Sequence, residues 1–165
     1  MTEAEMSPIL TQPIYLDNQA TTPVDPRVLE VMLPYFTDRF GNPGSIGHQY
    51  GWAAEAGVKQ ARSQLAAAIQ ASPEEIIFTS GATEANNLAI QGVVNKPPGR
   101  VVISAIEHPS VSETARQVQR NGFEVRLIGV DSDGLVRVEQ LDDIVDEHTR
   151  LVSVMLGNHE TGVLQ

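Results

Sequence analysis

The chain of 165 residues contains no cysteine, which excludes disulfide bonds, thiolate metal sites and a cysteine nucleophile within it. Aromatic residues make up only 5% of the sequence, so Ala, Val, Ile and Leu must fill most of the interior. No apolar run approaches the ~20 residues that a membrane span needs, and we predict no membrane role. The N-terminal region has no basic stretch, so we expect no secretory signal and a cytoplasmic protein.

Positive charge is also scarce, because 11 Lys and Arg stand against 21 Asp and Glu and give a net charge of −10. Such a charge argues against non-specific nucleic-acid binding and against docking on an anionic membrane. It does not argue against a small phosphorylated ligand, because backbone amides can bind a phosphate locally. The His, Asp and Glu residues show no metal-ligand spacing, so we predict no metal site.

The length suits one globular domain. We expect residues 1–12 to form a flexible tail and residues 13–165 to fold together, since no repeat or change of composition marks a second domain. Residues 13–16 read as a short strand. A helix follows from Pro26, capped by Asp25, and its apolar side chains fall at helical spacing and predict a buried face: Val28, Leu29, Met32, Leu33 and Phe36.

A loop with several glycines covers residues 40–48, where His48 reads as a surface residue, and a long helix is expected over residues 50–70. From residue 74 onwards strands and helices alternate. The expected strands are 76–78, 100–104, 123–128 and 151–156, and the expected helices are 84–93, 109–121 and 138–147. This order predicts an α/β fold with a mostly parallel sheet flanked by helices.

Residues 80–83, Ser-Gly-Ala-Thr, join the expected strand 76–78 to a helix. The first N–H groups of a helix have no intrahelical partner, and the helix dipole adds positive charge there. This turn can therefore be a phosphate cup, in which Gly81 and Ala82 allow close approach and Ser80 and Thr83 supply hydroxyls. The alternative is an ordinary strand-to-helix turn with Ser80 as the N-cap, because small-residue turns of this kind are common.

Two further strand ends carry polar side chains, namely Glu107-His108 and residues 158–160, Asn-His-Glu. The ligand of an open α/β sheet lies beyond the carboxyl ends of its strands, so the three ends indicate one shared site. His108 can stack on a planar cofactor or move protons, or it can simply bond its own helix N-terminus. Asn158 and His159 can bind a ligand oxygen or close a turn, and Glu160 is expected to brace the loop.

Four pieces of the sequence, in this order, resemble the cysteine desulfurases of the NifS/IscS type, within the class V branch of the fold-type I pyridoxal-phosphate enzymes. They are Tyr15–Pro23 (YLDNQATTP), Gly41–Ser45 with His48 and Gly51, Phe78–Asn87 (FTSGATEANN) with Glu107 and His108, and Asn158–Gly162 (NHETG). The resemblance covers almost the whole chain from Pro13. It implies that residues 13–165 are the N-terminal part of the large, cofactor-binding domain of that fold.

The resemblance implies a homodimeric enzyme that takes sulfur from L-cysteine, leaves L-alanine and an enzyme persulfide, and passes the sulfur to an iron–sulfur scaffold or another acceptor protein. It implies that Ala82 and Thr83 hold the phosphate of pyridoxal 5′-phosphate. It further implies that His108 stacks on the cofactor ring and assists proton transfer. The loop Ala20, Thr21 and Thr22 would border the substrate.

The chain departs from the family in two ways. The family usually has Asn where this chain has His159, and that Asn donates a hydrogen bond to the cofactor's phenolic oxygen; an imidazole N–H can replace it. The chain also lacks the segments that in the family carry the Asp that pairs with the pyridine nitrogen, the cofactor-binding lysine, the catalytic cysteine and the carboxylate-binding arginine. Neither of its two lysines, Lys59 and Lys96, follows an expected strand, so neither matches the family's lysine. We therefore expect an N-terminal fragment that is inactive alone. The alternatives are another class V enzyme, such as a selenocysteine lyase, or a non-catalytic relative that acts through dimerisation.

Overall fold

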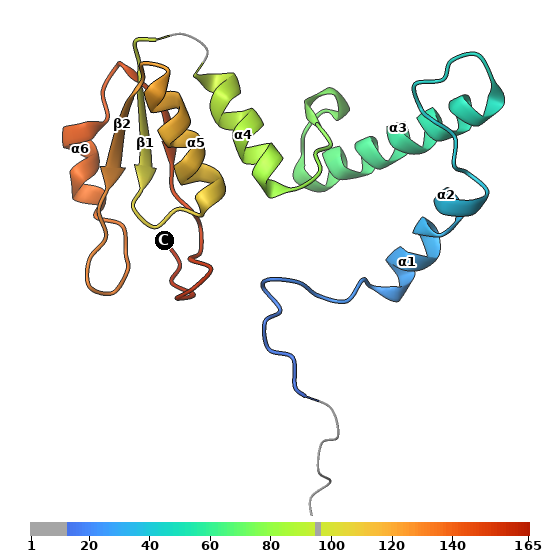
Figure 1. Ribbon diagram of the computed structural model, residues 1–165, viewed down its shortest axis with the longest axis horizontal. Coiled ribbons are helices and arrows are strands. Elements are labelled where there is room, and N and C mark those ends of the chain that lie inside the picture. The colour runs from blue at the N-terminus through green and yellow to red at the C-terminus, as the bar shows by residue number, and fades with distance from the viewer. Residues whose placement is uncertain (1–12, 95–96) are drawn as a thin grey trace, which may run out of the picture. The chain divides into compact units, whose positions relative to one another are not determined.

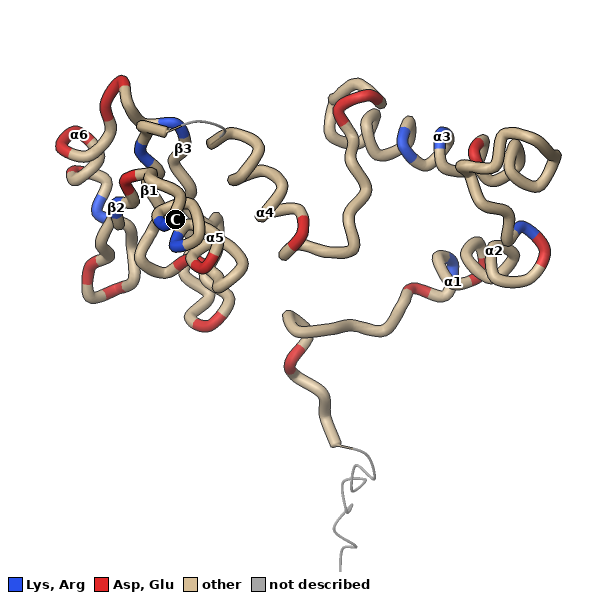
Figure 2. The backbone as a smooth tube through the Cα atoms, turned by 45° about the horizontal axis from the view of Figure 1, so that its top comes forward, with Lys and Arg blue, Asp and Glu red and all other residues tan. Residues whose placement is uncertain are grey.

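The computed structural model describes residues 13–94 and 97–165, and the chain divides into two compact units, one ending at Ile76 and the other running from Ile77 to Gln165 (Figure 1). The tail predicted over residues 1–12 lies outside the described residues. Acidic residues are distributed along both units, in agreement with the net charge of −10 (Figure 2). In the part of the chain that the structure describes, none of the helices combines the length and the apolar character needed to cross a membrane.

The first unit is helical. Its elements are α1 (Pro26–Met32), α2 (Pro34–Thr37), α3 (Gln49–Ile69) and the 3-10 helix η1 (Pro73–Glu75). The predicted cap is confirmed, because an Asp25 carboxylate oxygen accepts a hydrogen bond from the backbone N–H of Arg27. His48 is exposed, as predicted, and its Nδ1 accepts a hydrogen bond from the N–H of Gly51 at the start of α3.

The glycines of the first unit explain part of the motif at residues 41–51. A Cβ at Gly51 would collide with the backbone carbonyl of Ser45, and a Cβ at Gly41 would collide with that of Tyr50. The loop can therefore lie against the start of α3 only because these two positions have no side chain.

Two predictions for the first unit are wrong. Residues 13–16 form no strand, because no described strand lies beside them to share a hydrogen-bond ladder. The apolar side chains of α1 and α2 are exposed rather than buried, since neither helix has any buried residue. Helical periodicity indicates an apolar face but does not supply the surface that covers it.

The second unit contains the predicted α/β arrangement. Its strands β1 (Arg100–Ser104), β2 (Glu124–Ile128) and β3 (Thr149–Ser153) form a parallel sheet in the order β2-β1-β3. Helices α4 (Ala82–Val93) and α5 (Pro109–Arg120) lie on one side of the sheet, and the short η2 (Val138–Gln140) and α6 (Leu141–Ile144) follow β2 (Figure 1). This confirms the predicted fold class.

The core of the second unit lies between β1 and the helices α4 and α5. Val101, Val102 and Ile103 of the central strand are buried, as expected for a parallel strand covered on both faces. The core cluster is completed by residues from α4, α5 and the start of β2: Ile90, Val94, Val111, Ala115, Val118 and Phe123. Gly122, at φ +93, ends α5 in the left-handed conformation that glycine adopts readily.

The expected strand 76–78 is absent. Ile77 and Phe78 are 67% and 47% exposed, and no described strand pairs with this segment. Residues 80–83 therefore lead into α4, whose first residues are Ala82 and Thr83, without following a strand. A run of β-branched and aromatic residues favours a strand only when a neighbouring strand completes its hydrogen bonds.

The prediction of a helix over residues 138–147 is also wrong, because the helical segment ends at Ile144. Arg100 of β1 donates hydrogen bonds to the Ile144 carbonyl at 3.0 Å and to the Asp146 carboxylate at 2.7 Å. The Asp146 side chain in turn accepts from the backbone N–H of His148. These contacts hold residues 144–148 in a turn that leads into β3, and they override the local helix preference.

Candidate functional site

The N-terminus of α4 has the features of an anion site. Gly81 is the N-cap, in an extended conformation, and no described side chain caps this end of the helix. The first N–H groups of α4, at Ala82 and Thr83, therefore face outward, and both residues are exposed. The surroundings of Gly81 are open, since an added Cβ would meet no described atom within 4 Å. The helix end can thus bind a phosphate through backbone amides and the Thr83 hydroxyl.

Ser80 is not the N-cap, so that alternative for the turn is wrong. Its backbone N–H and its hydroxyl both donate to the same Glu84 oxygen, each at 2.6 Å. The side-chain hydrogen bond from Ser80, followed by that from its backbone, lowers the pKa of the Glu84 carboxyl. Ser80 is therefore used to hold Glu84, which leaves Thr83 as the hydroxyl of the turn that is available to a ligand.

His108 is the N-cap of α5 and lies at the carboxyl end of β1. Its Nδ1 accepts a hydrogen bond from the backbone N–H of Ser110 at 3.1 Å and lies 2.9 Å from the Ser110 hydroxyl. The ring thus makes the local helix bond that was one of the two predictions for it. Because only Nδ1 is used in this way, and because the residue is exposed, the rest of the ring is available to a ligand.

The loop after β3 brings a second imidazole to the same place. The rings of His108 and His159 lie edge to face, with centroids 5.2 Å apart and planes at 65°. Nδ1 of His159 is buried and has no hydrogen-bond partner among the described residues. A buried ring nitrogen without a partner is costly, and a ligand oxygen placed beside it would satisfy it.

Asn158 shapes this loop rather than pointing to a ligand. Its Oδ1 accepts from the backbone N–H groups of Glu160 and Thr161 and from the Thr161 hydroxyl, at 2.9–3.1 Å. Its amide nitrogen lies 3.4 Å from the carbonyl of Ile106. The turn-closing interpretation of Asn158 is therefore the one that the contacts favour, and Asn158 itself does the bracing that was expected of Glu160.

Glu107 joins the two loops that carry His108 and His159. One carboxylate oxygen, Oε1, accepts from the buried hydroxyl of Ser104 at 2.8 Å and from the backbone N–H of Met155 at 2.7 Å. Ser104 ends β1 and Met155 follows β3, so Glu107 ties together the carboxyl ends of two neighbouring strands. Glu107 is part of a sequence motif, but its role could not be predicted, because its two partners are 3 and 48 positions away in the sequence.

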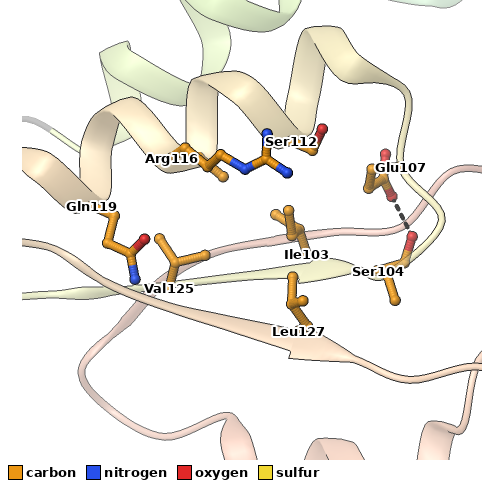
Figure 3. A pocket seen from close by; sticks show the side chains of 10 residues that line it. Ile103, Ser104, Glu107, Ser112, Arg116, Gln119, Val125 and Leu127 are labelled. Atoms are coloured by element: carbon orange, nitrogen blue, oxygen red, sulfur yellow. Dashed lines mark hydrogen bonds between the residues drawn. The ribbon is translucent and has the colours of Figure 1, made fainter.

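Two cavities lie near these loops. One, of about 380 Å³, lies between the N-terminal halves of α4 and α5, and it is lined by Thr83, Asn87, His108, Pro109, Ser110, Glu113, Thr114 and Gln117. It brings together two of the predicted site residues, Thr83 and His108. The other, of about 330 Å³, lies between α5 and the strands β1 and β2, with Arg116 and Gln119 over an apolar floor of Val125 and Leu127 (Figure 3). Among the predicted motif residues it includes Glu107 alone.

The remaining predicted residues belong to the first unit or fall outside the described residues. Ala20, Thr21 and Thr22 are exposed in the first unit, so they stay a prediction for the substrate border. Lys59 lies on α3 and pairs with Glu55 at 2.6 Å, while Lys96 lies outside the described residues. No cluster of three or more potential metal ligands occurs among the described residues.

Comparisons with known proteins agree with this geometry. Residues 14–165 match the family described as Aminotransferase class-V. The chain is 51% identical over 156 residues to a cysteine desulfurase IscS of Neisseria meningitidis, an alignment that covers 93% of this chain and 39% of the relative. A solved structure of a NifS-like protein superposes with a TM-score of 0.87 at 40% identity, covering 93% of this chain and 43% of the other. A structure of SspA in complex with cysteine gives a TM-score of 0.82 at 37% identity, covering 92% and 44%.

Proposed function

This chain belongs to the class V aminotransferase family, and on that premise we propose that it provides the phosphate-binding half of a pyridoxal-phosphate site in a cysteine desulfurase. The chain spans about two fifths of the length of the curated relatives that it matches, so the activity of the whole protein is part of this proposal. The observation that carries it is the placing of Thr83 and His108 on one cavity, beside a helix end that no described side chain caps.

The residues present fit the cofactor. Ala82 and Thr83 would bind its phosphate through N–H groups and one hydroxyl, at the end of α4 where the helix dipole favours negative charge. The unpartnered Nδ1 of His159 would meet an oxygen of the cofactor, in place of the amide that the family usually has there. His108 would lie against the ring. When bound, pyridoxal phosphate supplies the electron sink that stabilises negative charge on the amino-acid substrate.

The chain's own residues then have separable tasks. The end of α4 fixes the cofactor by its phosphate, and the brace formed by Glu107 keeps the loops of His108 and His159 in register. His108 holds or moves a proton at Nε2, since its Nδ1 is already bonded to Ser110. Ala20, Thr21 and Thr22 would border L-cysteine. A homodimer, and delivery of sulfur to an iron–sulfur scaffold or another acceptor protein, complete the proposal.

The test is the release of L-alanine from L-cysteine, with pyridoxal phosphate added, by the protein that carries this sequence. We expect alanine and a persulfide in equal amounts; no alanine from an intact, cofactor-loaded protein would contradict the proposal. The relatives are named as desulfurases, which favours this reaction over the selenocysteine lyase alternative. We also propose that the 165 residues alone release no alanine, because Lys59 lies within the helix α3, where it is paired with Glu55, and follows no strand.

A further inference from the structure

Asn86 lies in the motif that predicted the phosphate cup, yet it belongs to the helix interior rather than to the turn. On α4, its amide nitrogen donates a hydrogen bond of 2.8 Å to the hydroxyl of Ser110 on α5. The two helices lie side by side in the second unit (Figure 1). Ser110 is only 7% exposed, so its hydroxyl depends on protein partners rather than on water.

The Ser110 hydroxyl lies between Asn86 and His108. Its oxygen is 2.8 Å from the Asn86 amide nitrogen and 2.9 Å from Nδ1 of His108. The amide NH₂ can only donate, so it occupies the hydroxyl oxygen as an acceptor and leaves the hydroxyl proton for another partner. That partner is Nδ1 of His108.

The backbone sets the direction of the last bond independently. The N–H of Ser110 also donates to Nδ1 of His108, at 3.1 Å. A backbone N–H is never an acceptor, so Nδ1 must carry a lone pair, and the ring proton must lie on Nε2. Two donors on one residue, the second oriented by Asn86, thus converge on the same nitrogen.

We propose that Asn86 and Ser110 are positioning residues that hold His108 in its Nε2–H tautomer. They do so through two successive hydrogen bonds, from the Asn86 amide to the Ser110 hydroxyl and from that hydroxyl to Nδ1 of His108. The role of that tautomer in proton transfer rests on the proposed function. The tautomer itself does not rest on the proposed function, because all three hydrogen-bonding residues belong to this chain. The arrangement also links α4, whose end would bind the phosphate, to the ring that would lie on the cofactor.

An Asn86→Asp change should reverse the direction of these hydrogen bonds, while the side chain keeps nearly the same size and shape. A carboxylate can only accept, so the Ser110 hydroxyl would turn its proton toward Asp and present a lone pair to His108. Nδ1 would then lose one of its two donors and face a lone pair instead. The Gln91→Glu change is the matched control, since it makes the same amide-to-carboxylate change on α4 at an exposed residue whose side chain, among the described residues, bonds only Asn87.

The experiment is ¹⁵N NMR of the full chain with ¹⁵N-labelled histidine, in which the signals of His108 are assigned by their loss in His108→Gln. The two ring nitrogens are well separated in frequency when only one carries the proton. We expect His108 of the unaltered chain to be almost entirely Nε2–H. Asn86→Asp should lower the ratio of Nε2–H to Nδ1–H by about tenfold, the effect of one hydrogen bond of about 1.4 kcal/mol. Gln91→Glu should leave the ratio unchanged.

Ser110→Ala provides the second, independent arm. It removes the hydroxyl and keeps the backbone N–H, so the ratio should fall, and adding Asn86→Asp to it should cause no further change. An unchanged ratio in Ser110→Ala, or an equal effect of Asn86→Asp with and without the hydroxyl, would overturn the proposal. So would an Nδ1–H tautomer in the unaltered chain. None of these results depends on bound cofactor, so a protein that failed to release alanine would overturn the proposed function and leave this inference standing.

Discussion

Removing the Glu107 carboxylate should loosen the carboxyl edge of the sheet, where the predicted site residues lie. In Glu107→Ala, the buried hydroxyl of Ser104 and the backbone N–H of Met155 both lose their acceptor. Hydrogen bonds to a charged group contribute about 1.5–3 kcal/mol each, and the loss of stability is larger where the remaining partner cannot reach water. Ser104 is 1% exposed and takes the full loss, whereas the loop after β3 is open enough for water to replace part of the other bond.

We therefore expect Glu107→Ala to destabilise the second unit by about 3 kcal/mol, out of the roughly 5–15 kcal/mol typical of a domain. Glu107→Gln keeps an acceptor oxygen in the same place and should cost about 1 kcal/mol. Glu147→Ala is the control, because the side chain of Glu147 is 83% exposed and its loss should change stability by less than about 0.5 kcal/mol.

Amide hydrogen exchange is the suitable assay, because it reports on the individual residues of the second unit, whereas the only tryptophan of the sequence, Trp52, belongs to the first unit. Exchange at β1, β3 and Met155 should accelerate by about two orders of magnitude in Glu107→Ala, which corresponds to about 3 kcal/mol. Exchange rates equal to those of Glu147→Ala would refute the reasoning, because the two hydrogen bonds would then contribute nothing to the fold.

Four further predictions concern the site and the amino-terminal end of the strands. Thr83→Ala should weaken the binding of pyridoxal phosphate by about tenfold, through one lost hydrogen bond, and leave that of phosphate-free pyridoxal unchanged in a binding titration; equal losses for both would contradict the phosphate role. His159→Asn should retain cofactor, since an amide can donate the same bond, and cofactor loss in a dialysis assay would show that the imidazole does something else. His108→Ala, in the cofactor-loaded protein, should slow alanine release while cofactor absorbance persists; unchanged turnover would remove its catalytic role. The side chain of Arg100 is 12% exposed, and its hydrogen bond lowers the pKa of Glu124. This pair therefore stabilises the fold above the unfolded pKa of Glu, about 4.3, and the stabilisation disappears as the pH falls through the lower pKa of the folded state. Arg100→Met should flatten the acid side of a curve of stability against pH, and an unaltered curve would show that the pair is not linked to folding.

Local signals in the sequence predicted much of the fold correctly. The strands β1 and β2, and the helices α3, α4 and α5, lie within a few residues of their predicted bounds. Each is bounded by a cue that acts within a few residues, such as Pro109 at the start of α5 and Gly122 at its end.

The errors come from partners that are distant in the sequence or not among the described residues. Residues 76–78 have strand composition but no strand beside them. The helix after β2 ends early because Arg100, more than 40 positions away, holds Ile144 and Asp146. No local pattern contains this information.

The site shows the same division. The sequence singled out Thr83 and His108, which line one cavity, and His159, which lies against His108. It missed Ser110 and Asn86 as the residues that orient His108, since their contact crosses from α4 to α5 over 24 positions. The Asn86-Asn87 pair after a Thr was the available signal, but an amide in a helix has many uses, and only the packing of the two helices selects this one.

The most direct test of the account is a titration of pyridoxal phosphate into the chain, followed residue by residue in ¹H–¹⁵N spectra. Binding through the end of α4 predicts the largest changes at the amides of Ala82 and Thr83 and at the ring signals of His108 and His159, with pyridoxal leaving the two amides unmoved. Changes confined to other parts of the chain, or equal effects of the two compounds at Ala82 and Thr83, would contradict the assignment of this helix end to the cofactor's phosphate.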